Sequence, residues 1–594
     1  TARYRLLDGL YIKYSGSTSV NYDVNNSFYK KIPFIDEKGN IFGYNRQDVR
    51  VSEDWARANY YNNLVMLDYT KNIHDNHDIY VMAGFQSEEN RTDNIGASAN
   101  KFPTNEIREI SGTSGSGSDI VGTSKATEWS IASFIGKANY TFKNKYIFEG
   151  TIRYDGSSRF SPNRKWGLFP SASASWRIQQ ENFMQAIDWL SNLKLRLSWG
   201  QLGNQGSELY PFAIQISTSN QYPFGNGLSS IAQIGSPVDL NLSWEKKTTT
   251  NIGLDYGFFN NKLSGSIDVF FDRTNGIIGR PVVPSTFGAE APIQNCYTID
   301  NKGYEIELKW NDQIGDFKYF ISANFFDNRD KIVSLGGIGS YDPAFGDGLV
   351  QKGGSTYNAE GKPRNSLYLY RTNGLFVDQK EIDNHAFISN LTRPGDIAFI
   401  DTNQDGKVTP EDKVADNRTT TPHYFYGFSF GGSYKNFDFM AVFNGVGQRW
   451  DYRNNGGTYL TGVRATLSIL EENYNNRWTE ENPDKFADQT RLTQNNWIAN
   501  EYSTITAGPC EYHLRNFGYL RLKNLQVGYT IPSTWLESLR ISKLRCYLTA
   551  ENLLTIAPGY KEPIDPESVA DYTDDGSAFF GVPRVVSFGV QVNF

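Results

Sequence analysis

The last nine residues alternate apolar with small or polar side chains without a break and end on Phe594. Because successive side chains of a β-strand point to opposite faces, this pattern predicts a strand with one apolar and one polar face. The apolar face carries Val586, Phe588, Val590, Val592 and Phe594, and the polar face carries Ser587, Gly589, Gln591 and Asn593. Such a strand suits the boundary between lipid and an aqueous lumen.

The same alternation predicts a hairpin over residues 131–154, with a turn at 143–145. One face of this hairpin carries Phe134, Gly136, Ala138, Tyr140, Phe142, Tyr146, Phe148, Gly150, Ile152 and Tyr154. The other face carries charges, among them Glu149 and Arg153. Since a dry protein core rarely holds unpaired charges, the polar face is expected to meet water.

Two further hairpins are predicted, over residues 248–258 with 263–272 and over 302–310 with 317–327. In the second hairpin, apolar residues alternate with Glu305, Glu307 and Lys309. We expect Glu305, Glu307 and Lys309, like Glu149 and Arg153, to line a lumen and to hold a plug by ion pairs. All such segments together give roughly 16 strands. The predicted fold is all-β, a transmembrane antiparallel barrel.

Composition and charge argue against several classes of protein. The chain is 39% hydrophobic with a mean hydropathy of −0.51, and no apolar run reaches the ~18 residues that a spanning helix needs. The net charge of −7 argues against a nucleic-acid partner. Only five histidines are present, and no His-Glu-x-x-His spacing occurs. We therefore expect no enzymatic activity, and the three cysteines (Cys296, Cys510 and Cys546) indicate no chemistry.

Short and long connections alternate along the chain, as in outer-membrane barrels with tight periplasmic turns and long external loops. The long connections are predicted at 88–128, 205–245, 273–300, 334–420 and 448–515. Loop aromatics are candidates for stacking on a substrate, although packing of loop against loop is the alternative. The candidates are Tyr341, Tyr357, Tyr368, Tyr370, Trp450, Tyr452, Trp478, Trp497 and Tyr502.

Residues 401–412, DTNQDGKVTPED, match the calcium loop of an EF-hand. The expected ligands, at loop positions 1, 3, 5, 7, 9 and 12, are Asp401, Asn403, Asp405, Lys407 through its carbonyl, Thr409 and Asp412. The loop departs from the EF-hand because an aspartate replaces the last glutamate and no helix precedes it. We expect a structural Ca²⁺ site in an extracellular loop; the alternative is an acidic turn held by Asx hydrogen bonds without metal.

Several stretches together resemble the SusC/RagA family of TonB-dependent outer-membrane transporters of the Bacteroidetes. They are GSSRFSPNRKWGLFPSASASWRI (156–178), LKLRLSWGQLGNQG (193–206), NLSWEKKTTTNIGLDYGFFNNKLSGSIDVFF (241–271), PGDIAFIDTNQDGKVTPEDK (394–413), YLRLKNLQVGYTIP (519–532) and LTAENLLTI (548–556). Their joint order across nearly the whole chain carries the resemblance.

The resemblance implies that residues 1–594 form the C-terminal part of a barrel of about 22 strands. The N-terminal domain, the plug and the first strands would then lie outside this chain. It also implies nutrient uptake in the outer membrane, with TonB acting through the missing N-terminal part and a SusD-like lipoprotein covering the outer face. The expected substrate is an oligosaccharide or a peptide, and the transporter–lipoprotein pairs are expected to dimerise.

Two alternatives remain open from the residues alone. A passive porin of about 16 strands would have an adequate strand count. A secreted all-β protein that binds glycans or mediates adhesion would bury its apolar residues between sheets and need no detergent. The charged inner faces and the outward apolar alternation weigh against the secreted protein.

Overall fold

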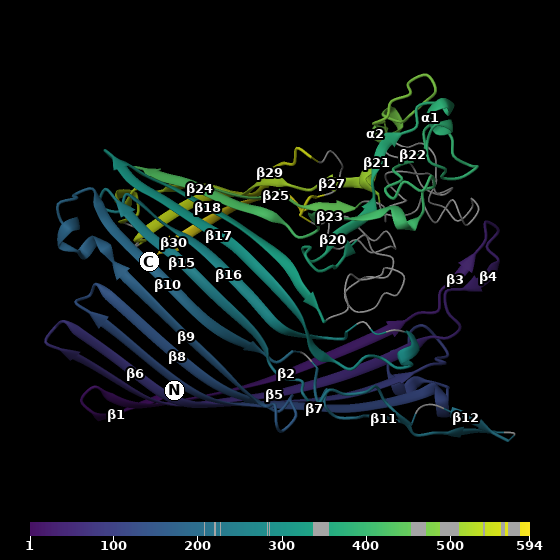
Figure 1. Ribbon diagram of the computed structural model, residues 1–594, viewed down its shortest axis with the longest axis horizontal. Helices are drawn as coiled ribbons and strands as arrows, with labels where there is room; N and C mark the ends of the chain where they lie inside the picture. Colours follow the sequence, from purple (N-terminus) through teal and green to yellow (C-terminus); the bar gives the residue numbers. More distant parts are fainter. Residues whose placement is uncertain are drawn as a thin grey trace.

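One 17-stranded sheet dominates the computed structural model, which describes residues 1–206, 208–218, 221–225, 227–281, 283, 285–336, 356–452, 471–487, 510–537, 541–559, 565–567 and 582–593 (Figure 1). Each strand pairs antiparallel with the next strand of this sheet along the chain. The strands are β1 (Ala2–Leu7), β2 (Leu10–Tyr29), β5 (Arg50–Ile73), β6 (His77–Ala99), β7 (Ile120–Phe142), β8 (Tyr146–Ser157), β9 (Trp166–Arg177), β10 (Leu190–Asn204), β15 (Glu245–Phe258), β16 (Leu263–Gly279), β17 (Gln294–Ile314), β18 (Phe317–Leu335), β24 (His423–Tyr434), β25 (Phe437–Gln448), β28 (Tyr519–Thr530), β29 (Lys543–Ile556) and β30 (Val585–Asn593).

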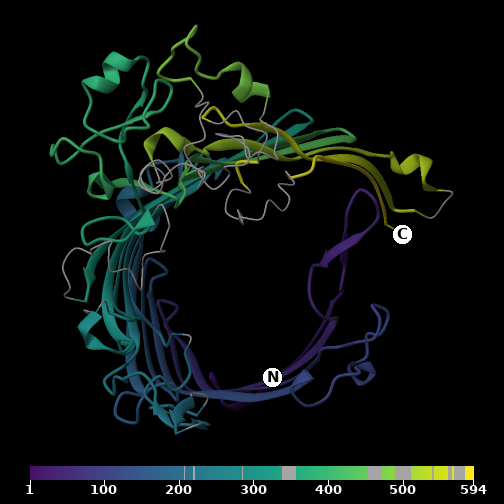
Figure 2. The same cartoon turned by 90° about the vertical axis from the view of Figure 1, so that its right-hand side faces the viewer.

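The sheet curls into an arc around an open interior (Figure 2). Its two edges are β1 and β30, and no pairing joins these two strands in the part of the chain that the structure describes. This architecture confirms the predicted all-β antiparallel barrel fold, with 17 strands where the sequence pattern gave roughly 16.

The two faces of the sheet differ in chemistry as the alternation predicted. Apolar side chains on the outer face are strongly exposed, among them Val65, Phe85, Phe134, Leu197 and Ile252. The neighbouring positions lie on the inner face, and many of them carry polar or charged groups, such as Gln86, Arg196 and Asn251. A wall that is apolar outside and polar inside separates lipid from water.

Aromatic clusters mark two levels on the outer face. Near the long connections, Phe134 lies 5.3 Å from Phe85 and 6.0 Å from Trp166, whose ring stacks on Tyr154 at 4.8 Å between centroids. At the opposite end of β7, the ring of Phe142 stacks near that of Tyr146. The distance from Phe134 to Phe142, eight positions further along β7, is about 27 Å along the strand, or about 20 Å of height at a tilt of ~40°. The clusters thus match the two aromatic girdles that border lipid.

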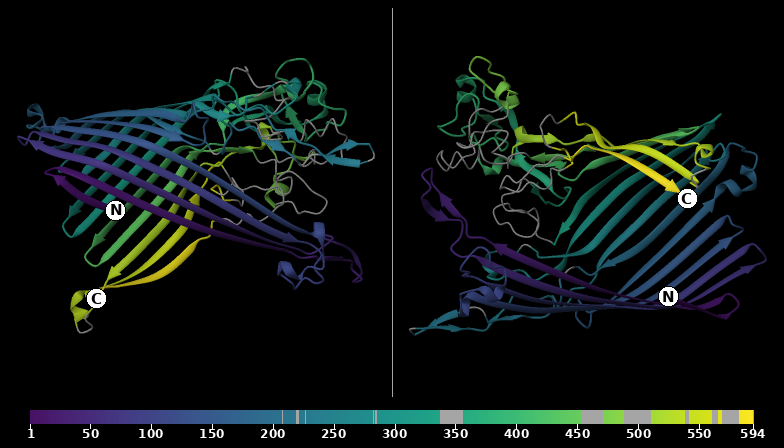
Figure 3. Two further views of the ribbon diagram at one scale, coloured as in Figure 1. Left: turned by 90° about the horizontal axis from the view of Figure 1, so that it is seen from below. Right: turned by 180° about the vertical axis from the view of Figure 1, so that it is seen from behind.

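Four strands continue well past the upper girdle. β2, β5, β6 and β7 have 20, 24, 23 and 23 residues, whereas a membrane crossing needs about 10. Beyond Phe134, β7 runs outward for 14 further residues to Ile120, or about 46 Å along the strand. These strands form an extended wall on one side of the barrel (Figures 1 and 3).

Short connections cluster at one end of the sheet and long ones at the other. The turn at 143–145 is tight because Lys143 and Asn144 adopt positive φ values of 50° and 54°. Two of the long loops are shorter in the structure than predicted. Strands β6 and β7 extend into 88–128 and leave residues 100–119 as the loop, and β16 and β17 extend into 273–300 and leave residues 280–293. Where a strand extends into water, both of its faces can carry polar residues. Such a segment has the same polarity as a loop, so the sequence pattern placed the strand ends too early.

The remaining elements are short. They are β3 (Pro33–Ile35), β4 (Ile41–Tyr44), β11 (Ile216–Ser217), β12 (Gln221–Phe224), β13 (Gly227–Ser230), β14 (Gln233–Ile234), β19 (Thr356–Tyr357), β20 (Ser366–Tyr370), β21 (Thr372–Leu375), β22 (Ile397–Phe399), β23 (Lys413–Thr419), β26 (Trp450–Tyr452), β27 (Leu514–Asn516), α1 (Gln379–Asp383) and α2 (Glu471–Asn475). No helix within the described ranges is long and apolar enough to cross a membrane.

Candidate functional site

Charged side chains of the inner wall form ion pairs across the strands. Arg196 of β10 contacts Asp255 of β15 at 2.8 Å and Asp268 of β16 at 2.9 Å. Lys137 of β7 lies 2.9 Å from Glu149 of β8. All of these groups are partly exposed, which suits a water-filled lumen rather than a dry core. The predicted polar inner face is therefore present, and it is held in place by its own charge pairs.

A groove of about 810 Å³ runs along this inner wall over β6–β10 and β15. Arg153 and Asp155 pair within it at 3.1 Å. Its volume falls in the range of small-ligand sites, about 300–1,000 Å³. The polar side chains along it include Glu88, Glu149, Arg153, Asp155, Ser171 and Gln201.

Two long connections fold together at the open end of the barrel into one unit, here called the rim module. It consists of the described residues in 356–422 and 471–517. Its core joins side chains from both connections, with Phe376 and Phe399 from the first and Trp478 and Cys510 from the second. Each of these four is at most 8% exposed, so the two connections pack as one body.

An ion network ties the two halves of the rim module together. Arg418 contacts Asp416 at 2.6 Å and Glu511 at 2.7 Å, and Arg371 reaches Glu511 at 2.9 Å. Burial alone would raise the pKa of Asp416, but hydrogen bonds and charge from Arg418, with the charge of Arg371, hold it below its usual value. A second link joins Glu381 to Lys485.

The acidic loop at 401–412 lies in the rim module and is closed by its own hydrogen bonds. The carboxylate of Asp401 accepts the N–H groups of Gln404 at 2.7 Å and Gly406 at 2.8 Å. In the same way, the side chain of Asn403 accepts the N–H of Asp405 at 2.9 Å. Position 3 of the predicted calcium loop therefore adopts an Asx turn, while Asp401 at position 1 closes the loop over three and five residues. Both side chains still have lone pairs that could bind an ion.

Asp412, at position 12 of this loop, has a different environment. It is fully buried, and its carboxylate accepts the N–H groups of Thr402 at 2.8 Å, Asn403 at 3.2 Å and Thr409 at 2.7 Å. In the described ranges, no three His, Cys, Asp or Glu side chains are grouped to hold a metal ion. Asp412 thus fits a capping role better than a bidentate ligand, while Asp401, Asn403 and Asp405 fit an ion. Calcium stays a prediction.

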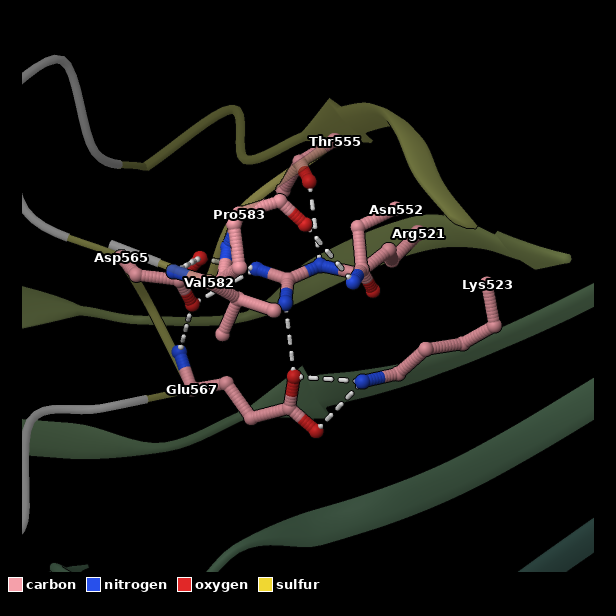
Figure 4. A network of polar contacts seen from close by, with 8 residues as sticks. All are labelled: Arg521, Lys523, Asn552, Thr555, Asp565, Glu567, Val582 and Pro583. Carbon is pink, nitrogen blue, oxygen red and sulfur yellow. Dashed lines mark hydrogen bonds and ion pairs between the residues drawn. The ribbon is translucent and has the colours of Figure 1, made fainter. Parts of the chain in front are cut away.

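A buried arginine of β28 anchors residues 565–567, which belong to the connection between β29 and β30 (Figure 4). The side chain of Arg521 is 1% exposed and pairs with Asp565 and with Glu567, the latter at 2.7 Å. Glu567 also pairs with Lys523 at 2.7 Å. Thr555 accepts the remaining Nε–H of Arg521 at 3.0 Å. Full pairing is what allows a guanidinium to be buried here.

The predicted loop aromatics fall into several environments. Trp478 is 8% exposed in the core of the rim module, and Tyr370 is fully buried there. Trp450 is partly buried, and the guanidinium of Arg418 lies 5.1 Å from its ring centroid. These rings pack loop against loop, which leaves a substrate little surface to stack on. Tyr357 lies on β19, Tyr368 on β20 and Tyr452 on β26, while Tyr341, Trp497 and Tyr502 lie outside the described residues.

Sequence reasoning missed the Arg196 and Arg521 clusters, whose members are far apart in the chain. It also missed a Gly-x-Ser-x-Gly spacing at Gly427–Gly431. That motif carries no catalytic site here because Ser429 lies inside β24, paired with Ser322 on one side and Val442 on the other. A nucleophile elbow instead needs a sharp strand-to-helix turn. The cysteines Cys296, Cys510 and Cys546 are thiols.

Comparison with known proteins identifies the family of this chain. The family model described as "TonB dependent receptor-like, beta-barrel" matches residues 1–553. The chain belongs to the TonB-dependent receptor family. It is 30% identical to the TonB-dependent receptor SusC of Bacteroides thetaiotaomicron over 75% of this chain and 42% of SusC. A TonB-dependent receptor of Formosa agariphila is 27% identical over 100% of this chain and 60% of that receptor.

A solved structure supports this family assignment. The structure of the RagAB peptide transporter superposes with a TM-score of 0.80 and 25% identity, over 100% of this chain and 61% of that chain. These matches confirm the predicted SusC/RagA family and the outer-membrane location. The chain spans roughly half of the length of the relatives it matches, with shares of 60% and 42%.

Proposed function

We propose that this receptor imports a large nutrient across the outer membrane, driven by TonB. The observation that carries the proposal is the charged, ion-paired inner wall behind an apolar outer wall, with Arg196, Asp255 and Asp268 as its clearest group. A passage for a hydrated solute needs such a wall. Membership of the TonB-dependent receptor family supports energised transport rather than passive diffusion.

Further polypeptide completes the barrel and fills it. The open edges at β1 and β30 support this step, because unpaired backbone groups of an edge strand are too costly in lipid. In this proposal, an N-terminal part supplies the remaining strands, a plug and the segment that contacts TonB. Inner-wall charges such as Glu305, Glu307 and Lys309, which form no ion pair among the described residues, then contact the plug.

A SusD-like lipoprotein covers the rim in this proposal, and transporter–lipoprotein pairs dimerise. Support comes from the relatives, since RagAB is named a peptide transporter and SusC is a TonB-dependent receptor. The rim module offers a rigid seat for such a lid because its two halves share one core and one ion network. The cargo is an oligosaccharide or a peptide, and the hydroxyl groups and charges of the inner groove suit either class.

Uptake in the native bacterium tests the function. The experiment compares the wild type, a strain lacking the receptor gene, the complemented strain and a strain lacking TonB, each given fluorescent oligosaccharides and peptides. The proposal expects at least one cargo class to enter only when both the receptor and TonB are present. Equal uptake of every cargo by all four strains would overturn it.

Bilayer conductance separates an importer from a passive porin. The receptor purified from outer membranes is inserted into planar bilayers. A plugged importer gives no steady current until the plug is destabilised with urea, whereas a porin conducts at once. Steady conductance without urea, combined with TonB-independent uptake, would establish the porin.

A further inference from the structure

A second pocket, of about 460 Å³, lies on the wall formed by β5, β6 and β7. Tyr210, from the connection between β10 and β15, closes one side of it, because its hydroxyl group donates a 2.6 Å hydrogen bond to the backbone oxygen of Glu128. Tyr61 contributes a second ring, which is 49% exposed. The import pathway described above makes no use of this pocket.

The pocket opens on the outer face of the wall, away from the lumen. On β5, Tyr61 lies four residues from Val65, and on β7, Glu128 lies six residues from Phe134, so each shares a face with an exposed apolar residue. Arg91 on β6 is six residues from Phe85 and lies on the same outer face. The pocket therefore lies on the outer face of the sheet, the same face that contacts lipid nearer the short turns.

The pocket lies at or just above the level of the membrane headgroups. Ser130 lines the pocket four residues beyond Phe134 of the upper girdle, or about 13 Å along the strand and about 10 Å in height at a tilt of ~40°. Polar headgroups occupy roughly 5–8 Å outside the hydrocarbon core. A ligand in this pocket would thus lie at or just above the headgroups of the outer leaflet.

The chemistry of the pocket suits sugar hydroxyls better than phosphate. Arg91 is already paired with Asp93 at 3.1 Å and with Glu128 at 3.5 Å, so its charge is neutralised. Glu89 adds a further carboxylate, which would repel an anion. Amide and hydroxyl groups of Asn59, Ser130 and Ser158 supply neutral donors and acceptors.

We propose that this pocket binds the neutral saccharide headgroup of an outer-leaflet glycolipid. The sugar stacks between Tyr61 and Tyr210, and its hydroxyl groups bond to Asn59, Glu89 and the serines. Its lipid tails lie against the apolar wall below Phe134. This site goes beyond nutrient import and does not depend on it, because it lies outside the lumen.

Glycolipid retention tests the proposal. The receptor from native outer membranes is reconstituted into nanodiscs of phosphatidylethanolamine that contain equal amounts of a neutral hexosyl diacylglycerol and of phosphatidylglycerol, and lipid bound after return to mild detergent is counted by native mass spectrometry. The Tyr61→Ala variant is expected to retain about two- to tenfold less glycolipid, since one aromatic contact is lost. The matched control is Trp55→Ala, because Trp55 lies on the same face of β5 and is 52% exposed but does not line the pocket.

The outcomes separate the sources of the ligand. Specific retention by wild type and Trp55→Ala, together with loss in Tyr61→Ala, supports the site. Equal retention by all three proteins would overturn it. Binding of the free hexoside without retention of the hexosyl diacylglycerol would overturn the membrane source, and preferential retention of phosphatidylglycerol would overturn the neutral sugar. Each protein is first checked for heat-modifiable migration, which reports a folded barrel.

Discussion

Arg196 and Asp268 form a two-point ion pair although their strands, β10 and β16, do not pair with each other. The guanidinium donates to both carboxylate oxygens, at 3.0 Å and 2.9 Å. Gly253 of β15 lies directly between them in the register. The arginine can cross the intervening strand because glycine leaves no side chain in its path. Arg545 crosses Gly528 to reach Asp438 in the same manner.

Gly253→Ala should break this contact. A Cβ at this position would lie 2.5 Å from a carboxylate oxygen of Asp268 and 2.6 Å from Cζ of Arg196. We expect the free energy of unfolding to fall by about 1–3 kcal/mol, because overpacking forces the ion pair apart. Urea unfolding in lipid vesicles measures the loss. Gly150→Ala is the control, since a Cβ there meets nothing within 4 Å; similar loss in both variants would contradict the crossing role.

Arg521→Ala should free the connection between β29 and β30. Removing the guanidinium leaves Asp565 without its main partner, and breaking a buried pair costs about 3–5 kcal/mol. Faster proteolytic cleavage between these strands is expected, together with a lower free energy of unfolding.

The control for Arg521 is an exposed ion pair. Arg273 and Asp300 lie 2.6 Å apart with side chains 54% and 38% exposed. Arg273→Ala should cost at most about 1 kcal/mol. Comparable proteolysis in the two variants would show that Arg521 does not anchor the connection.

Calcium removal should weaken the binding of the lid if the acidic loop holds the ion. Chelation is expected to lower the affinity of the receptor for its lipoprotein partner, because the loop belongs to the rim module. Asp401→Ala combined with Asp405→Ala should abolish the chelator effect, since both are predicted ligands. Surface plasmon resonance with the purified partner measures the affinity.

Glu411→Ala controls for the loss of charge in this loop, because Glu411 is exposed and occupies a position that is not a predicted ligand. It should leave the chelator effect intact. Affinity that is unchanged by chelation in the wild type would argue for the metal-free turn.

Acid should remove the contribution of Glu181 to stability. Hydrogen bonds from Tyr146, Trp176 and Lys145 lower the pKa of this carboxyl to about 2. Because the folded pKa lies below the unfolded value of about 4.3, the contribution is full above that value and is lost as the pH falls toward 2. Thermal unfolding of wild type and Glu181→Gln in detergent should differ at pH 7 and converge near pH 2.

Glu290→Gln is the control for this titration, since the Glu290 side chain is 72% exposed. Its unfolding temperature should follow that of the wild type at every pH. A gap between wild type and Glu181→Gln that persists unchanged at pH 2 would contradict the role of the carboxylate.

The strand segments were largely predictable from local pattern. The hairpin over 131–154 appears as β7 and β8 with its turn at the expected residues, and the pair at 248–258 and 263–272 corresponds to β15 and β16. Alternation with period two is enforced by lipid on one face and water on the other, so it is visible in the sequence. The extended wall was missed because beyond the membrane both faces meet water and the constraint disappears.

The site was less predictable. The loop aromatic Trp478 looked available for a ligand, but it is buried because two distant connections share one core. The pairing of Arg196 with Asp268 depends on the register of three strands, which adjacent residues do not encode.

The sequence by itself thus determined the strands, their inward and outward faces, the polar lumen and the acidic loop, because each follows from neighbours in the chain. Only the tertiary structure decided which charges pair across glycines, which aromatics are buried and where the rim module forms. Those features arise between residues up to 140 positions apart, as for Arg371 and Glu511. They depend on the folding of the chain, which brings such distant residues into contact.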